Sequence, residues 1–100
     1  MNEVQKAILI GSREESGIWE VLTDISDETG VDRQMAFSLL KNEINFILAR
    51  DDIYLIRSEK LYDSSTCSVI DKNNIKNMEL NDVEFNQSGP FFYFSNMPAV

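Results

Sequence analysis

Apolar residues recur along the first half of the chain with the spacing of amphipathic helices. Val4, Ala7 and Ile8 lie three and four residues apart, which predicts a short helix over residues 2–10 that Gly11 ends. A second pattern follows directly. The stretch 12–15, Ser-Arg-Glu-Glu, matches a capping box and predicts the start of a second helix.

The second helix is predicted from one apolar stripe and a closing glycine. Its apolar positions have the spacing of a single buried face: Ile18, Val21, Leu22 and Ile25. Gly30 closes it, and Asp32 can cap a third helix that runs to Arg50. The third helix has the longest apolar repeat in the chain: Ala36, Leu39, Leu40, Ile44, Ile47 and Leu48.

The second half changes to short β-type runs. Residues 53–56 are β-branched and aromatic, which predicts a strand joined tightly to the third helix, and residues 64–66 mark a loop or wing. Residues 91–94 read as a closing strand that pairs with residues 53–57. Because side chains alternate along a strand, one ring pair of the closing strand points inward and one outward; the rings are either part of the core, which is the favoured interpretation, or one pair is open to solvent as an apolar patch or a dimer edge.

A fourth, weaker helix is predicted between these strands. Asp71 can cap it, and it extends through Ile75 and Met78 toward Leu80, before the break at residues 89–90, Gly-Pro. Residues after Pro98 are expected to fray.

The order of elements predicts an α+β fold in one domain, residues 1–100. Three N-terminal helices are followed by a small antiparallel sheet with one extra short helix, which is winged-helix-like. A chain of 100 residues is long enough for one modest core.

Two stretches carry a resemblance to a known group of proteins. Residues 36–57, AFSLLKNEINFILARDDIYLIR, are similar to a helix, junction and strand found in small bacterial proteins, and residues 69–80 followed by PFFYF resemble the tail of those proteins. Proteins of this kind, small and acidic, resemble the immunity proteins of contact-dependent growth-inhibition toxin systems. The resemblance implies a protein that binds and neutralises a toxin.

Composition narrows the class of partner. Seventeen acidic residues against nine basic ones give a net charge of −8, and the chain has no histidine. Such a charge repels nucleic acid and anionic membranes and attracts basic proteins. A single cysteine, Cys67, and the absence of a signal-peptide or membrane-spanning stretch indicate a reducing, cytoplasmic setting.

The acidic residues are concentrated in the second helix. Residues 12–32 hold seven acidic residues and one basic residue. Four of the acids fall on one face, opposite the apolar stripe: Glu20, Asp24, Asp27 and Glu28. Like charges at this spacing each destabilise a helix by about 0.2–0.5 kcal/mol. The face is either an ordinary solvated surface or a docking surface for a basic partner.

Other residues extend this candidate surface. Trp19 flanks the acidic face and is either a core residue or an aromatic anchor of the interface, and Tyr54 and Tyr62 are candidates for the same role from the sheet. Asp51 and Asp52 either form a turn before the strand or add to the acidic surface.

The sequence offers no equipment for catalysis. Without histidine, the usual general base and the commonest metal ligand are missing, and there is no phosphate-binding glycine loop. We therefore expect no enzyme activity, no metal and no cofactor.

The leading hypothesis is an inhibitor, monomeric until it joins its partner in a heterodimer. The partner is a basic cognate toxin, with a nuclease favoured because its cleft must attract phosphates. The alternatives are a winged-helix-like regulator and a DNA-mimicking adaptor for another basic protein.

Overall fold

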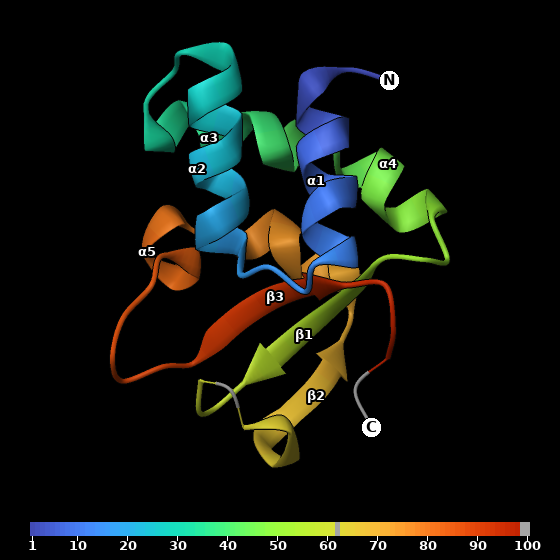
Figure 1. Cartoon of the computed structure of the whole chain (residues 1–100), viewed down its shortest axis with the longest axis vertical. Helices are drawn as coiled ribbons and strands as arrows, with labels where there is room; N and C mark the ends of the chain where they lie inside the picture. The colour runs from blue at the N-terminus through green and yellow to red at the C-terminus, as the bar shows by residue number, and fades with distance from the viewer. Residues whose placement is uncertain (62, 99–100) are drawn as a thin grey trace.

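A computed structural model describes residues 1–61 and 63–98 of the chain. The elements, in order, are α1 (Glu3–Arg13), α2 (Ile18–Thr29), α3 (Arg33–Asn42), α4 (Ile44–Ala49), β1 (Tyr54–Ser58), the 3₁₀ turn η1 (Ser64–Thr66), β2 (Cys67–Ile70), the 3₁₀ helix η2 (Lys72–Asn77), α5 (Leu80–Val83) and β3 (Phe91–Ser95). The fold is α+β, with N-terminal helices followed by a small antiparallel sheet and a short helix, as the sequence predicts (Figure 1). Tyr62 and the expected fraying after Pro98 lie outside the described residues.

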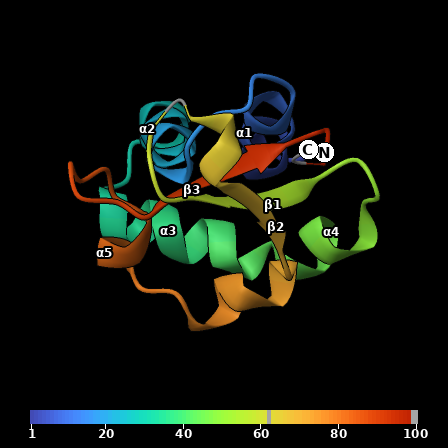
Figure 2. The same ribbon diagram turned by 90° about the horizontal axis from the view of Figure 1, so that it is seen from below.

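The helices form two groups above the sheet. α1 packs side by side with α2, and α3 and α4 lie behind this pair (Figure 1). In projection from below, the strands run along the line that separates α1 and α2 from α3 and α4 (Figure 2). The buried apolar side chains of these elements form one continuous core.

The sheet has three strands in the order β2-β1-β3, all antiparallel. The predicted pairing of the two apolar runs is confirmed, with Leu55 opposite Phe94. Both residues are fully buried and face the helices. β2 was not predicted: residues 64–66 form the expected turn, but the four residues after it are a strand.

The closing strand buries its phenylalanine rings, which agrees with the favoured interpretation of the sequence and not with the alternative of an exposed ring pair. Phe91, Phe92 and Phe94 are all buried. One face of β3 joins the core, and the other is covered by Trp19. The outer edge of β3 is partly paired too, because the backbone N–H of Phe94 donates to the carbonyl of Ser16 at 3.0 Å.

The first helix continues past Gly11, contrary to the prediction. It ends at Arg13, and Ser12 lies inside its last turn, where its hydroxyl donates to the Leu9 carbonyl. Ser12 therefore does not cap α2. Gly11 is used for close packing instead: a Cβ there would lie 2.5 Å from Cγ2 of Val21.

The predicted third helix is divided in two at Glu43. Asp32 caps α3 as predicted, accepting a hydrogen bond from the N–H of Met35 at 2.8 Å. The Glu43 carboxylate accepts hydrogen bonds from Asn2 and Gln5, next to and in α1, which holds the break in place.

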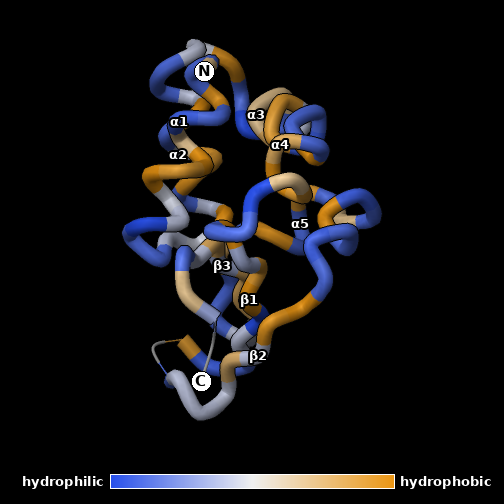
Figure 3. The backbone as a smooth tube through the Cα atoms, turned by 90° about the vertical axis from the view of Figure 1, so that its right-hand side faces the viewer, coloured by the Kyte–Doolittle hydropathy of each residue, from blue (hydrophilic) through white to orange (hydrophobic). Residues whose placement is uncertain are grey.

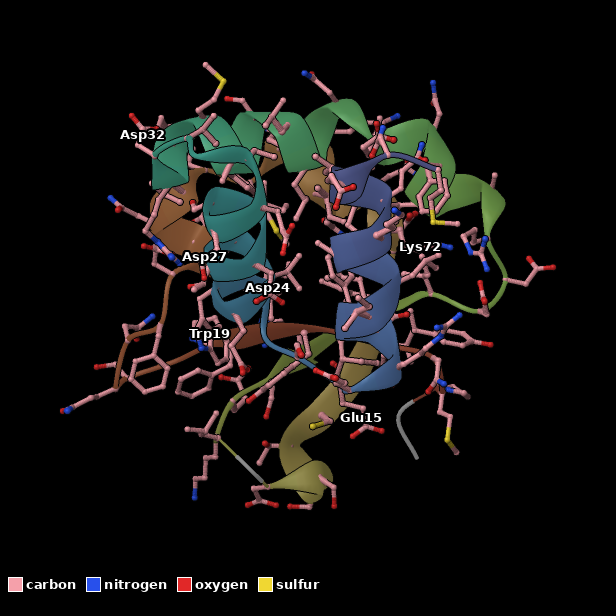
Figure 4. The ribbon with its side chains drawn as sticks, turned by 45° about the horizontal axis from the view of Figure 1, so that its top comes forward. Glu15, Trp19, Asp24, Asp27, Asp32 and Lys72 are labelled. Atoms are coloured by element: carbon pink, nitrogen blue, oxygen red, sulfur yellow. The ribbon has the colours of Figure 1, made fainter. Side chains whose placement is uncertain are left out.

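Lys72 closes the second half of that helix. Its Nζ donates to the carbonyls of Ile47 and Arg50 at 2.8 and 2.7 Å, at the carboxyl end of α4, and Figure 4 labels its side chain. A cation at this end is favoured by the partial negative charge of the helix dipole, and Lys72 gives the Arg50 carbonyl a hydrogen-bond donor.

The predicted fourth helix is also divided. Asp71 caps a helix as expected, accepting from the N–H of Asn73, but the helix is the 3₁₀ segment η2 and ends at Asn77. Leu80 begins the separate helix α5.

Candidate functional site

The second helix has one buried face and one charged face, as its sequence predicts. All four residues of the apolar stripe are at most 1% exposed, and α2 ends at Gly30, which adopts a left-handed conformation with φ of 74°. The predicted acidic residues, Glu20, Asp24, Asp27 and Glu28, are all exposed. Along the backbone tube, apolar and hydrophilic residues alternate through α1 and α2 (Figure 3).

Three of these four carboxylates have no internal partner. Glu20 accepts a hydrogen bond from the Gly17 N–H at 3.0 Å and caps the start of α2. Within residues 1–61 and 63–98, no ion pair or side-chain hydrogen bond involves Asp24, Asp27 or Glu28; the ion pairs are Lys6–Glu3, Arg33–Glu84, Arg50–Asp52 and Arg57–Glu59. We refer to Asp24, Asp27 and Glu28 as the α2 acidic face.

The position of this face in the helix makes its charge less favourable. Asp27 and Glu28 lie in the last turn of α2, which has no basic residue. The helix dipole places partial negative charge at this end. The carboxylates therefore repel one another and the helix terminus, and only solvent or an external cation compensates them.

Trp19 lies at the start of α2 in a cluster of aromatic rings. Its ring meets those of Phe85, Phe91 and Tyr93 edge to face, with centroids 5.5, 6.0 and 5.4 Å apart. The indole also lies over Gly17, where a Cβ would come within 2.5 Å of the ring. Trp19 is half-buried, so it covers the sheet and borders the surface at once.

Phe85 is a member of this cluster that the sequence did not indicate. It is 49% exposed and packs on Trp19 and Phe91, beyond the end of α5. It follows Glu84 in an irregular and otherwise polar segment, so no helical or strand spacing marks it. The aromatic cluster (Trp19, Phe85, Phe91 and Tyr93) thus ends in one ring open to solvent.

Arg33 fixes the aromatic cluster relative to the helices. Its guanidinium pairs with the Glu84 carboxylate and donates to the Trp19 carbonyl at 2.8 Å and to the Thr23 hydroxyl at 2.9 Å. The hydrogen bonds that Arg33 donates to the Glu84 carboxylate raise the pKa of Arg33 above its usual value. Glu84, which precedes Phe85 in the chain, and Trp19, which contacts its ring, are therefore held in place by Arg33.

Asp51, Asp52 and Tyr54 are not brought to this surface. Tyr54 pairs with Ser95 at one end of β3, whereas Trp19 contacts Phe91 at the other end. Asp52 accepts two hydrogen bonds from Arg50, which lowers its pKa. Figure 4 shows Asp27, Asp24 and Trp19 following one another along α2, with Glu15 at the end of α1.

In the part of the chain that the structure describes, no group of three or more metal-ligating side chains is found. None of the helices within the described ranges has the length and apolar character of a membrane span. The chain matches no protein-family model, no curated protein and no solved structure.

Proposed function

We propose that this protein is an acidic inhibitor, an immunity-type protein that binds and neutralises a basic cognate toxin, with a nuclease favoured. It would act in the cytoplasm, where a lone free cysteine such as Cys67 stays reduced. The resemblance noted in the sequence supports the toxin as partner, and the α2 acidic face supports a basic binding surface on it.

The single observation that carries the proposal is the uncompensated charge of Asp24, Asp27 and Glu28. Three exposed carboxylates on one helix face, none of which forms an ion pair with a described side chain, raise the rate of encounter with a basic surface. Their mutual repulsion is relieved when lysines or arginines of a partner approach. A face of this kind gains more from binding than a face of internal ion pairs.

The exposed ring of Phe85 supplies the apolar part of the same surface. Interfaces gain most of their affinity from a few aromatic or arginine side chains near the centre, with charged groups at the rim. Phe85 rests on Trp19, at the start of the helix that carries the acidic face. We assign Phe85 the role of anchor and the carboxylates the role of steering and orientation.

The cations of α3 and α4 support a protein partner over DNA. Arg33 is held by Glu84, Lys41 donates to the Met78 carbonyl at 2.9 Å, and Arg50 is held by Asp52. A helix that reads DNA presents free basic side chains to phosphates and bases. Here the basic side chains of the predicted recognition helix already have hydrogen-bond partners within the protein.

The proposal is tested by parallel capture from a lysate of the native host. The wild-type chain is immobilised beside the variant Asp24→Lys/Asp27→Lys and the control Asp51→Lys/Glu79→Lys, which makes the same change of charge away from α2. The proposal predicts one basic protein that the wild type and the control retain, that the α2 variant loses, and that 1 M salt releases. The captured protein must then lose its toxic activity when mixed with the wild-type chain.

Two outcomes would contradict the proposal. One is a partner that all three proteins retain equally, which would remove the α2 acidic face from the interface. The other is retention of nucleic acid in place of a basic protein, which would favour the winged-helix regulator.

A further inference from the structure

A groove lies on the outer face of the sheet, away from the core. It has a volume of about 630 Å³ and is open on one side. Its floor includes Ile56, Cys67 and Tyr93, from all three strands. Tyr93 also contacts Trp19, so the groove adjoins the aromatic cluster.

The charged residues that line this groove are all acidic. Glu14 and Glu15 border it from the connection between α1 and α2, and Asp63 borders it from the turn before η1. No lysine or arginine lines it within the described part of the chain. Lys60 lies close enough to Asp63 to help lower the pKa of that carboxyl, but the larger cause is the hydrogen bonding from Ser65.

Glu14 and Glu15 differ from Asp63 in being unpaired. Asp63 accepts hydrogen bonds from the N–H and hydroxyl of Ser65, whereas no side-chain hydrogen bond or ion pair of the described residues involves Glu14 or Glu15. Glu15 also has a positive φ of 53°, a conformation that a non-glycine residue adopts at a cost. The polar groups of the floor are already satisfied, since the hydroxyls of Ser58 and Ser95 donate to backbone carbonyls.

We propose that this groove receives a basic side chain, an arginine or a lysine, from the partner protein. An apolar floor with carboxylates at one border fits such a side chain, because its aliphatic stem is apolar and its end is charged. Glu14 and Glu15 offer carboxylate acceptors that no described side chain occupies. The volume is within the range of ligand-binding pockets and leaves room for the neighbouring backbone of the partner.

The identity of the partner rests on the proposed function, but the charge preference of the groove does not. The groove contains its own chemical probe, the free thiol of Cys67, which is half-buried in the floor. Two methanethiosulfonates of similar size, one ending in trimethylammonium and one in sulfonate, modify a thiol by forming a mixed disulfide with release of methanesulfinate. The ratio of their rate constants measures the charge preference at Cys67.

We expect the ratio of the cationic to the anionic rate constant at low salt to be about tenfold larger at Cys67 than at an exposed control thiol, because the carboxylates of Glu14 and Glu15 attract the cationic reagent and repel the anionic one. The variant Glu14→Gln/Glu15→Gln should lose most of this ratio. The control Asp51→Asn/Glu79→Gln, with the same net charge, should keep it. A thiol placed on the exposed side of α3, in Cys67→Ser/Ser38→Cys, reports the ratio that the net charge alone produces.

Several results would overturn the inference. A ratio of the two rate constants no larger at Cys67 than at position 38 would show that the groove has no preference for cations. A failure of both reagents to react would show that the groove is closed to a ligand of this size. These rates are measured on the free chain, so they are independent of whether α2 docks a partner. In the complex with the captured protein, Cys67 should become at least tenfold slower toward both reagents, and unchanged labelling there would also contradict the inference.

Discussion

The guanidinium of Arg33 holds the carboxylate of Glu84 through two hydrogen bonds, from Nε to Oε2 at 2.8 Å and from Nη2 to Oε1 at 2.5 Å. The two residues are 51 positions apart in the sequence. The pair joins the start of α3 to the end of α5, next to the exposed ring of Phe85. One ion pair therefore positions the aromatic part of the candidate surface.

Removing this guanidinium should destabilise the fold moderately. Arg33→Ala loses the pair with Glu84 and the hydrogen bonds to Trp19 and Thr23. We expect the free energy of unfolding to fall by about 1–2 kcal/mol, a value kept low because both side chains are about one-third exposed and screened by solvent. Chemical denaturation measures it. Arg33→Lys keeps the charge without the two-pronged geometry and should recover less than half of the loss; full recovery would mean that charge alone matters.

A second prediction concerns Gly11 in α1. In an exposed helix, replacing glycine with alanine stabilises by about 1 kcal/mol. Here the added Cβ would lie 2.5 Å from Cγ2 of Val21, a stiff β-branched side chain, and overpacking costs about 1–3 kcal/mol. Gly11→Ala should therefore lower the free energy of unfolding, by about 1 kcal/mol.

The partner variant Val21→Ala provides the control for Gly11. In that background the clash is removed, so adding Gly11→Ala should cost nothing or stabilise. An increase in stability from Gly11→Ala in the wild-type background would contradict the close packing of α1 against α2.

Substitution of Phe85 should lower the affinity for the partner more than it lowers the stability of the fold. Because its side chain is 49% exposed, Phe85→Ala should lower the free energy of unfolding by no more than about 1 kcal/mol. Its effect on affinity for the captured partner should be larger, about 2 kcal/mol or more, as for an interface anchor. Met35→Ala, at a ring-free position with 50% exposure on α3, is the matched control and should leave affinity unchanged. Equal affinity for the two variants would exclude Phe85 from the interface.

The cap of η2 should make stability depend on pH. The Asp71 carboxylate accepts hydrogen bonds from the N–H and side-chain amide of Asn73, and these bonds lower its pKa below the usual 3.8. Its contribution to stability is complete above about pH 4 and is lost as the pH falls through the lower value in the folded state. Asp71→Asn keeps an accepting oxygen that does not titrate in this range.

We therefore expect the melting temperature of Asp71→Asn to fall less than that of the wild type between about pH 5 and about pH 2. Asp51→Asn removes one charge from an exposed position and separates the loss of charge from the loss of the cap. Parallel melting curves for wild type and Asp71→Asn would contradict the prediction.

Local patterns in the sequence predicted those elements whose cause is local. The α2 stripe and the turn at Gly30 follow from spacing and from backbone freedom, and both are confirmed. The placement of the acidic residues on the opposite face follows from the same periodicity. The break at Glu43 could not be predicted, because it is held by Asn2 and Gln5, which are distant in the sequence.

The remaining differences have similar causes. From the sequence alone, Gly11 favours the end of a helix, because its close packing against Val21 depends on the tertiary structure. β2 is four residues long and half polar, so it carries too little apolar pattern to be recognised, and it forms because β1 offers it a free edge. Phe85 joins the candidate surface through the contact of its ring with Trp19, which no spacing encodes.

The central claim, that the α2 acidic face docks a basic protein, is tested most directly by the salt dependence of affinity for the captured partner. We would measure the dissociation constant from about 50 mM to about 500 mM salt for the wild type and for Asp24→Asn/Asp27→Asn/Glu28→Gln. We predict that wild-type affinity falls steeply with salt and that the variant binds at least about tenfold more weakly at low salt, with a much flatter slope. Equal affinities and equal slopes for the two proteins would contradict it.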